Sequence, residues 1–301
     1  MVVSLPTDTT TILRLPEMAT TKQFSNRDIA DYYDHTEVHY RMWWKADEAM
    51  GLHYGVWDED TRSTTEAILN VNRYLIRMGD IKPTDRVLDA GCGIGGSSIF
   101  LAKELGCETV GITLSDRQVA TATRLAAERG LSGKCTFRME DYTRTSFPDD
   151  SFDVVWAIES LGSAPDKALF FKEMRRILRP GGRIVIADTF KPKPYDITQN
   201  KTMLTMLNGW AISDILSIQE LQTMAAQHGF GEADVDDVSP KIEKSVQKLW
   251  WAGVLGAIGT KVYNLFKNAT PFSKIHYKTG LAQRKAYRAG SWGYYLVALR
   301  S

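Results

Sequence analysis

A short apolar run that ends at an acid and leads into closely spaced glycines constrains this chain more than any other feature. Residues 86–90 read Arg-Val-Leu-Asp-Ala and are followed by Gly91-Cys-Gly-Ile-Gly-Gly96, after which a helical pattern begins. A strand that turns sharply into a helix uses glycines because they tolerate the turn and let a ligand approach the backbone. The sequence therefore predicts a strand–turn–helix unit whose helix N-terminus faces a ligand.

Apolar runs and helical patterns alternate along the rest of the chain. Strands are expected where a short apolar run is bounded by turn residues, at residues 86–90, 109–113, 135–139, 153–158, 183–187, 233–238 and 292–299. Strands that alternate with helices form right-handed βαβ units and a parallel sheet. The sequence therefore predicts an α/β, Rossmann-like fold: a mostly parallel seven-stranded sheet with helices on both faces and an added helical cap over the ligand edge.

Local signals define several helix ends. Ser115 and Gln118 have the spacing of a capping box and predict a helix that runs to about Glu128. Pro165 is a suitable start for the next helix, which the stretch Pro180-Gly-Gly is expected to end.

The bulk properties exclude several classes of protein. Apolar residues make up 44% and charged residues 24% of the 301 residues, a balance that allows a sizeable core, and the net charge of +1 does not indicate nucleic-acid binding. Cys92, Cys107 and Cys135 are widely spaced and form no Cys/His cluster, so we expect neither a metal site nor a disulfide framework. No secretory signal or membrane-spanning run is apparent, and the expected location is cytoplasmic.

The glycine spacing also fits a dinucleotide-binding fingerprint, which would make NAD the ligand. Gly91, Gly93 and Gly96 formally satisfy G-x-G-x-x-G. The fingerprint further requires an acid at the end of the second strand, about twenty residues on, to hold the ribose. The corresponding segment, 111–115, contains no acid before Asp116. A bound NAD is therefore disfavoured.

Several ordered motifs resemble those of class I S-adenosylmethionine (SAM)-dependent methyltransferases, in the branch of tocopherol- and sterol-type C-methyltransferases and bacterial prenyl-diphosphate methyltransferases. The stretches that carry the resemblance are Asp89–Ser98, Gly111–Ser115 followed by Gln118, Glu140-Asp141, Phe147–Trp156 and Pro180–Ile184. The similarity extends from about residue 32 to residue 188. It implies the class I methyltransferase fold and SAM as the cofactor.

The resemblance also implies which residues bind SAM. By position in the motifs they are Asp89, Gly91, Gly93, Thr113, Leu114, Gln118, Asp141, Tyr142 and Ile158. Asp89 and the two glycines are expected at the methionine end, Gln118 at the ribose, and Asp141 at the adenine. Two simpler interpretations stay open, because Asp89 could cap the turn that follows it and Asp141 could be a solvated loop acid.

Glu159 is the candidate catalytic residue, because it follows the strand 153–158 at the carboxyl edge of the predicted sheet. In methylation of an alkene carbon, a carboxylate can stabilise the carbocation and accept the departing proton. The related enzymes usually carry His where this chain has Ser163, which removes a titratable group and puts their proton-handling scheme in doubt. The alternative is that Glu159 is a structural acid or a SAM contact.

The stretch Leu52–Trp57 is similar to the segment by which these enzymes cover the methyl donor. The resemblance implies that Tyr54 presents its ring face to the sulfonium and that His53 relays a proton. Simple packing is the alternative for both. The aromatic residues that precede this stretch are expected either to line an apolar pocket or to pack in the core: Tyr32, Tyr33, Trp43 and Trp44.

The C-terminal part of the protein is strongly basic. Residues 241–300 contain eleven Lys or Arg and one acid, Glu243. Apolar residues from Ile242 to Leu265 recur near helical spacing and surround Trp250-Trp251. Such a stretch can be a lid, a membrane-surface helix or a docking site for an anionic substrate, and it can also be a solvated helix face.

Together these features predict four segments and one activity. Residues 1–22 are a flexible or docking arm, 23–80 an N-terminal helical cap, 81–190 the SAM-binding core, and 191–301 the rest of the sheet with helical lid insertions. The predicted activity is carbon methylation of a small lipophilic isoprenoid or prenyl compound, which can be an anionic prenyl diphosphate, a sterol-like compound or a prenylated phenol. Peripheral membrane contact is left open. The alternatives are N- or O-methylation of a small amine or phenol and, more distantly, SAM binding without catalysis. The sequence does not indicate the oligomeric state.

Overall fold

The computed structural model describes residues 22–30, 32, 51, 53–264 and 271–301. Most of the predicted N-terminal arm lies outside the described residues. The same is true of the predicted pocket or core residues Tyr33, Trp43 and Trp44. No helix in the described part of the protein is both long enough and apolar enough to cross a bilayer.

The centre of the fold is a seven-stranded sheet with the strand order β3-β2-β1-β4-β5-β7-β6. Strands β1 to β5 run parallel, and β7 is antiparallel to both of its neighbours. The strands are β1 (Arg86–Ala90), β2 (Glu108–Thr113), β3 (Cys135–Met139), β4 (Phe152–Ile158), β5 (Leu178–Phe190), β6 (Asp234–Asp237) and β7 (Gly293–Arg300). This confirms the predicted Rossmann-like fold, and every predicted strand is present.

Two helical layers cover the sheet because its strands are apolar on both faces. Val87, Val154 and Val185 pack with the first layer, whereas Val155 and Ile184 pack with the second. The first layer contains α3 (Thr64–Met78), α4 (Gly96–Glu104) and α5 (Asp116–Glu128), and the second contains α6 (Lys167–Ile177) and α8 (Ile218–Gln227). Short 3-10 turns occupy Leu161–Ser163, Ile197–Gln199 and Ser239–Ile242.

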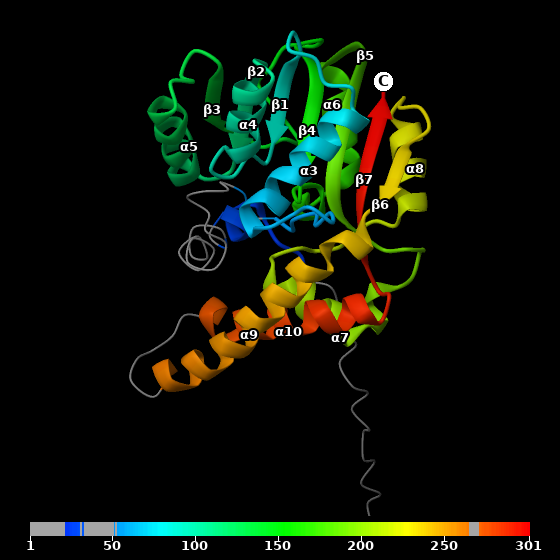
Figure 1. The fold of residues 1–301 in the computed structure, drawn as a ribbon. Helices are drawn as coiled ribbons and strands as arrows, with labels where there is room; N and C mark the ends of the chain where they lie inside the picture. Colours follow the sequence, from blue (N-terminus) through cyan, green and yellow to red (C-terminus); the bar gives the residue numbers. More distant parts are fainter. Residues whose placement is uncertain (1–21, 31, 33–50, 52, 265–270) are drawn as a thin grey trace, which may run out of the picture.

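Three further helices form a cap beyond the carboxyl edge of the parallel strands (Figure 1). They are α7 (Lys201–Gly209), α9 (Glu243–Asn264) and α10 (Pro271–Arg288), and α10 packs against both of the others. The described N-terminal residues divide between two places. Helix α3 packs on the face of the sheet against β5 and β7, where it shields the core. Tyr32, His53 and Tyr54 line a pocket at the carboxyl edge.

The helix ends differ from the sequence prediction in three details. The Ser115 hydroxyl accepts the predicted bond from the Gln118 N–H, but the Gln118 side chain turns to Thr113 instead of completing a capping box. Helix α6 begins at Lys167, two residues after Pro165, because the Asp166 carboxylate caps it. The predicted stop at residues 180–182 is wrong, because α6 ends at Ile177 and these residues form an irregular start of β5.

Helix α6 offers a direct test of this layered packing. Phe170 is fully buried, whereas its neighbour Leu169 is 46% exposed. Phe170→Ala should lower the free energy of unfolding by about 3–5 kcal/mol, because it leaves a cavity against β4 and β5. Leu169→Ala should change it by less than about 0.5 kcal/mol. Denaturant unfolding measures both, and equal losses would contradict the assigned faces.

Candidate active site

A cavity that is partly open to solvent lies at the carboxyl edge of the sheet. Its walls come from the loops that follow β1 to β5, from the cap and from residues near 51–54. The cavity brings together eleven of the predicted site residues: His53, Tyr54, Asp89, Gly91, Gly93, Thr113, Leu114, Gln118, Tyr142, Ile158 and Glu159. Tyr32 also lines it. Asp141 does not.

The glycine turn after β1 is held by backbone hydrogen bonds, since the N–H groups of Gly91 and Cys92 both donate to the carbonyl of Ile112. Gly91 and Gly93 have φ angles of 91° and 53°, in the region that favours glycine. A Cβ atom on Gly91 would lie 2.5 Å from the Cβ of Ser160, whereas one on Gly93 would meet nothing within 4 Å. The first glycine therefore lets two strand ends meet, and the second leaves space for a ligand.

Asp89 lies at the end of β1 and is buried. The Ser98 hydroxyl and N–H donate to its Oδ2 at 2.7 and 3.2 Å. Burial raises the pKa of Asp89 to about 6, and the bonds from Ser98 oppose this shift. Asp89 thus holds the first turn of α4, as the simpler interpretation suggested, and it also borders the cavity. Its contact with SAM stays a prediction.

In the cavity wall that follows β2, two polar side chains are oriented by a hydrogen bond to each other. The Thr113 hydroxyl donates to the Oε1 of Gln118 at 2.5 Å, and both side chains are buried. Because that oxygen is engaged, the amide nitrogen of Gln118 is the group that can donate to a ligand hydroxyl. Leu114 adds an apolar surface next to it.

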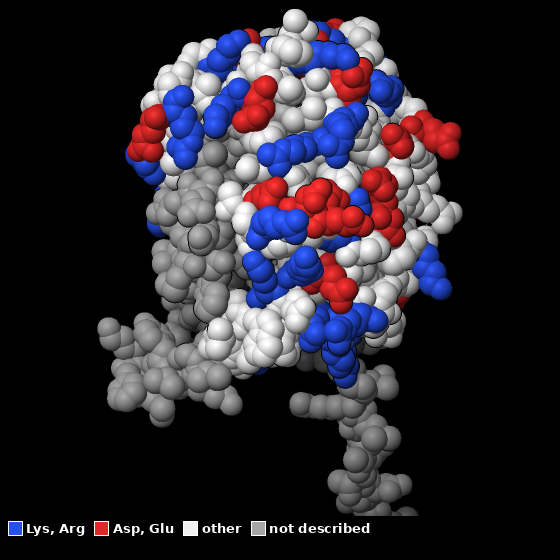
Figure 2. Space-filling view, in the orientation of Figure 1, with Lys and Arg blue, Asp and Glu red and all other residues white. Residues whose placement is uncertain are grey.

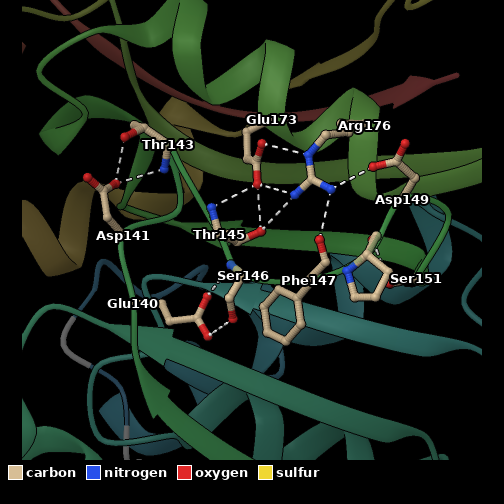
Figure 3. Close-up of polar contacts among 11 residues, drawn as sticks. Glu140, Asp141, Thr143, Thr145, Ser146, Phe147, Asp149, Ser151, Glu173 and Arg176 are labelled. Carbon is tan, nitrogen blue, oxygen red and sulfur yellow. Dashed lines mark hydrogen bonds and ion pairs between the residues drawn. The ribbon is translucent and has the colours of Figure 1, made fainter.

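The loop after β3 is braced from α6 (Figure 3). The Arg176 guanidinium bonds to Glu173 and Asp149, and Glu173 in turn accepts from both the N–H and the hydroxyl of Thr145. This ion-pair network fixes the course of the loop from β3 to β4. It thereby supports the part of the cavity wall that Glu140 and Tyr142 form.

The Asp141 side chain is held by local hydrogen bonds. Its carboxylate accepts two bonds from Thr143 at 2.7 Å (Figure 3) and one from the Asn26 side chain at 2.6 Å. Its neighbours Glu140 and Tyr142 line the cavity instead. The carboxylate of Asp141 is therefore used to hold its own turn and the 26–30 helix. An adenine contact of Asp141 stays a prediction that this geometry does not favour.

Glu159 ends β4 with a φ of 48°, an unusual backbone conformation for a residue other than glycine. Its Oε1 accepts the Tyr54 N–H at 2.7 Å. Burial raises the pKa of Glu159 to about 8, and the nearby Asp188 raises it further, while the Tyr54 N–H and the Tyr294 hydroxyl oppose the shift. A strained, buried carboxylate in a cavity is typical of a functional site.

Asp188, at the end of β5, is a cavity residue that the sequence analysis missed. It accepts the N–H groups of Gly162 and Thr189 at 3.1 and 2.7 Å, and burial raises its pKa to about 6. The signal was present, because Asp188 follows the strand beside β4 and parallel strands end at one edge. The adjacent Ser163 hydroxyl is buried and has no hydrogen-bond partner among the described residues.

The segment around Tyr54 connects Glu159 to the cap. The Tyr54 hydroxyl donates to the Gln283 side chain of α10 at 2.9 Å, and the Ser245 hydroxyl of α9 bonds to the backbone of Gly55. The Nδ1 of His53 lies 2.8 Å from the Tyr54 carbonyl, and burial lowers the pKa of His53 to about 4. His53 is therefore neutral near pH 7. Gln283, on which this connection depends, carried no sequence signal.

Aromatic rings surround Tyr54. Its ring centroid lies 6.3 Å from that of Trp210, 5.5 Å from that of Trp292 and 5.6 Å from that of Tyr294. Such clusters combine apolar burial with ring faces that attract cations. The contact of the Tyr54 ring with a sulfonium stays a prediction.

The charged side chains among the described lining residues are all acidic. Its described lining contains the carboxyl groups of Asp89, Glu140, Glu159 and Asp188 and no lysine or arginine. A buried cation is stabilised by such groups, whereas a phosphate would be repelled. The site therefore suits a positively charged ligand rather than a dinucleotide.

Comparison with known proteins agrees with this geometry. The family model described as "Methyltransferase domain" matches residues 88–186. The chain is 32% identical over 189 residues to 27-O-demethylrifamycin SV methyltransferase of Amycolatopsis mediterranei, a match that covers 62% of this chain and 69% of that protein. The chain belongs to the class I SAM-dependent methyltransferases. The predicted enzyme class and cofactor are thereby confirmed.

Two further proteins, one compared by sequence and one by structure, match different shares of the chain. The methyltransferase is 34% identical over 179 residues to sterol 24-C-methyltransferase erg6 of Aspergillus fumigatus, a match that covers 58% of this chain but only 48% of that protein. A solved structure of the [4+2]-cyclase SpnF superposes with a TM-score of 0.77 at 22% identity, over 94% of this chain and 98% of that one. The structural likeness shows the fold alone.

The site has the features that SAM requires. The open space at Gly93 gives room against the turn, Gln118 offers a donor, and Asp89 and Glu159 supply negative charge for a sulfonium nucleoside. The described lining contains no lysine or arginine that would repel the sulfonium. These residues of the methyltransferase are therefore the ones expected to hold SAM.

A substitution at Gly93 tests this placement, with Gly130 as a matched control. Both glycines have positive φ, 53° and 70°, and neither would crowd an added Cβ, but only Gly93 borders the cavity. Alanine at either position should cost about 1 kcal/mol of stability. Calorimetry should then show weaker SAM binding by Gly93→Ala alone. Equal affinities of the two variants would contradict the assignment of the turn.

The raised pKa of Glu159 gives a second prediction. Without ligand, Glu159 is largely protonated near pH 7, and the positive charge of bound SAM favours the carboxylate. Binding of SAM should therefore strengthen as the pH rises through about 8, whereas S-adenosylhomocysteine (SAH) lacks the sulfonium charge. We expect the SAM-to-SAH affinity ratio to rise about tenfold between about pH 7 and pH 9, a range above the pKa of about 6 of Asp89 and Asp188. In Glu159→Gln the ratio should change by less than about twofold over this range, and a slope as steep as that of the unmodified protein would exclude Glu159 as its source.

Proposed function

We propose that this methyltransferase transfers the methyl group of SAM to a carbon atom of a neutral, lipophilic, isoprenoid-type acceptor. The observation that carries the proposal is Glu159, a partly buried carboxyl group with a raised pKa at the carboxyl edge of the sheet, in a described lining without lysine or arginine. The cavity wall near it is apolar and aromatic, with Trp210, Ile212 and Leu249 from the cap side. These properties favour an apolar acceptor over an anionic one.

The proposed chemistry uses residues already described. SAM supplies an electrophilic methyl group, and its C–S bond breaks as the π electrons of an acceptor double bond form the new C–C bond. Positive charge then develops on the other carbon of the double bond. The Glu159 carboxylate stabilises that charge and accepts the proton that leaves, so that a neutral alkene is restored.

The acidic side chains of the described lining also bear on the acceptor class. They repel an anionic group that carries no metal ion of its own. Sterol-like compounds or prenylated phenols are therefore the acceptors that we propose.

Oxygen methylation is the second candidate, and two observations favour it. The relative from Amycolatopsis mediterranei carries the name of an O-methyltransferase. A carboxyl group with a pKa of about 8 is also a reasonable general base for a phenol, whereas His53, with a pKa of about 4, is a weak one. Here Glu159 would remove the hydroxyl proton as the oxygen attacks.

Labelled SAM and a panel of acceptors separate these candidates. The panel contains sterols, prenylated phenols, prenyl alcohols, prenyl diphosphates and amines, and mass spectrometry locates the added methyl group. Methylation of a neutral prenyl or sterol carbon is the expected result. Product only at oxygen supports the second candidate, and product only from amines or diphosphates contradicts the proposal. SAH binding without turnover on any acceptor would support SAM binding without catalysis.

The variant Glu159→Gln tests the proposed catalytic role of Glu159. It should lower kcat by a factor of about a hundred or more, because it removes the proton acceptor and the negative charge. SAH affinity should change by less than about threefold, because SAH carries no sulfonium charge for the carboxylate to attract. The control Glu232→Gln, at an exposed position, should leave both unchanged. Full turnover in Glu159→Gln would exclude this role.

A further inference from the structure

The outer side of α9 exposes two large apolar residues. Trp251 is 51% and Leu255 49% exposed, and their spacing of four residues places them on one side of the helix. Lys244 and Lys248 precede them at spacings that belong to the same side, and the ammonium groups of both lie over the ring of Trp57 at the edge of this surface. Figure 2 shows an uncharged patch over this part of the cap with blue, basic side chains next to it. Apolar and cationic groups are thus combined on one surface.

The exposed Trp251 packs against a neighbouring aromatic ring. The Trp251 ring packs against Trp250 with centroids 4.7 Å apart, and the Arg284 guanidinium of α10 lies 4.5 Å from the Trp250 ring. Trp251 therefore has a defined packing partner on α9, and that partner is in contact with α10.

The opposite side of the same helix reaches the active site. Val246 is buried in the core, and Leu249 lines the cavity. Helix α9 therefore has one side at the acceptor cavity and the other at the molecular surface. An apolar compound bound near Trp251 and Leu255 would lie one helix diameter from the cavity.

Cations are concentrated on this cap. Helices α9 and α10 together contain eight Lys or Arg against one acid, Glu243, although the whole protein has a net charge of only +1. A shallow groove between α7 and α10 adds a second group of cations, Lys201, Lys278 and Lys285. The excess suits a partner with many negative charges, and exposed aromatic and apolar side chains suit one with an apolar interior. An anionic lipid bilayer has both properties.

We propose that the cap docks on an anionic lipid surface, with Trp251 and Leu255 in the headgroup region and the lysines of α7, α9 and α10 near lipid phosphates. Docking goes beyond the proposed function and does not depend on which atom is methylated. It would give a lipophilic acceptor a short path from the bilayer to the cavity along α9. A second copy of the protein is the main competing occupant of the patch.

Vesicle sedimentation of the full-length protein tests the proposal without any acceptor. The vesicles are phosphatidylcholine with or without phosphatidylglycerol, and the expected result is binding that depends on phosphatidylglycerol and weakens with salt. Replacement of Trp251 and Leu255 by serine should lower binding by about tenfold. The triple change Lys201→Gln, Lys278→Gln, Lys285→Gln should lower it at least about tenfold.

Leu169→Ser, at an exposed leucine of α6, is the matched control and should bind vesicles like the unmodified protein. Thermal unfolding and SAH calorimetry verify that each variant is folded. Vesicle binding that is absent, that ignores phosphatidylglycerol, or that survives the Trp251 and Leu255 replacements would overturn the proposal. Light scattering that shows a dimer lost on these replacements would assign the patch to self-association instead. None of these outcomes depends on methyl transfer, so a failed acceptor panel would leave the docking result intact.

Discussion

The hydrogen bond from the Tyr54 N–H to Glu159 joins the two parts of the molecule on which the account depends. Glu159 belongs to the sheet, and Tyr54 belongs to a segment tied to α9 and α10 through Ser245 and Gln283. A buried carboxyl group is unfavourable without partners, and this donor offsets part of that cost. The bond therefore places the acid at the cavity and fixes the cap over it.

The raised pKa values of the cavity acids also reflect the cost of burying a carboxylate. Burial raises the pKa of Asp89 and Asp188 to about 6 and that of Glu159 to about 8, although the nearby Lys167 opposes the shift of Asp188. The described lining itself contains no lysine or arginine. A sulfonium ligand supplies such a positive charge. The site is thus organised to receive a cation, and the apolar cap walls keep water from weakening the attraction.

The sequence was sufficient where local rules decide the structure. The glycine turn at 91–96 and all seven strands follow from residue type and period, and the strand ends correctly placed Glu159 at the cavity. The sequence was insufficient where distant contacts decide. Gln283 meets Tyr54 only through the packing of α10, and Asp141 is drawn away from the cavity by Thr143 and Asn26. Residues 180–182 extend β5 because Leu178 pairs with Phe152, which local propensity does not reveal.

The central claim is that the turn after β1 holds a sulfonium nucleoside rather than a dinucleotide. Parallel calorimetric titrations of the full-length protein with SAM, SAH and NAD test it most directly. The account predicts saturable binding of SAM and SAH at a single site, each displacing the other, and no measurable heat with NAD. Absence of SAM and SAH binding, or binding of NAD in competition with them, would contradict it.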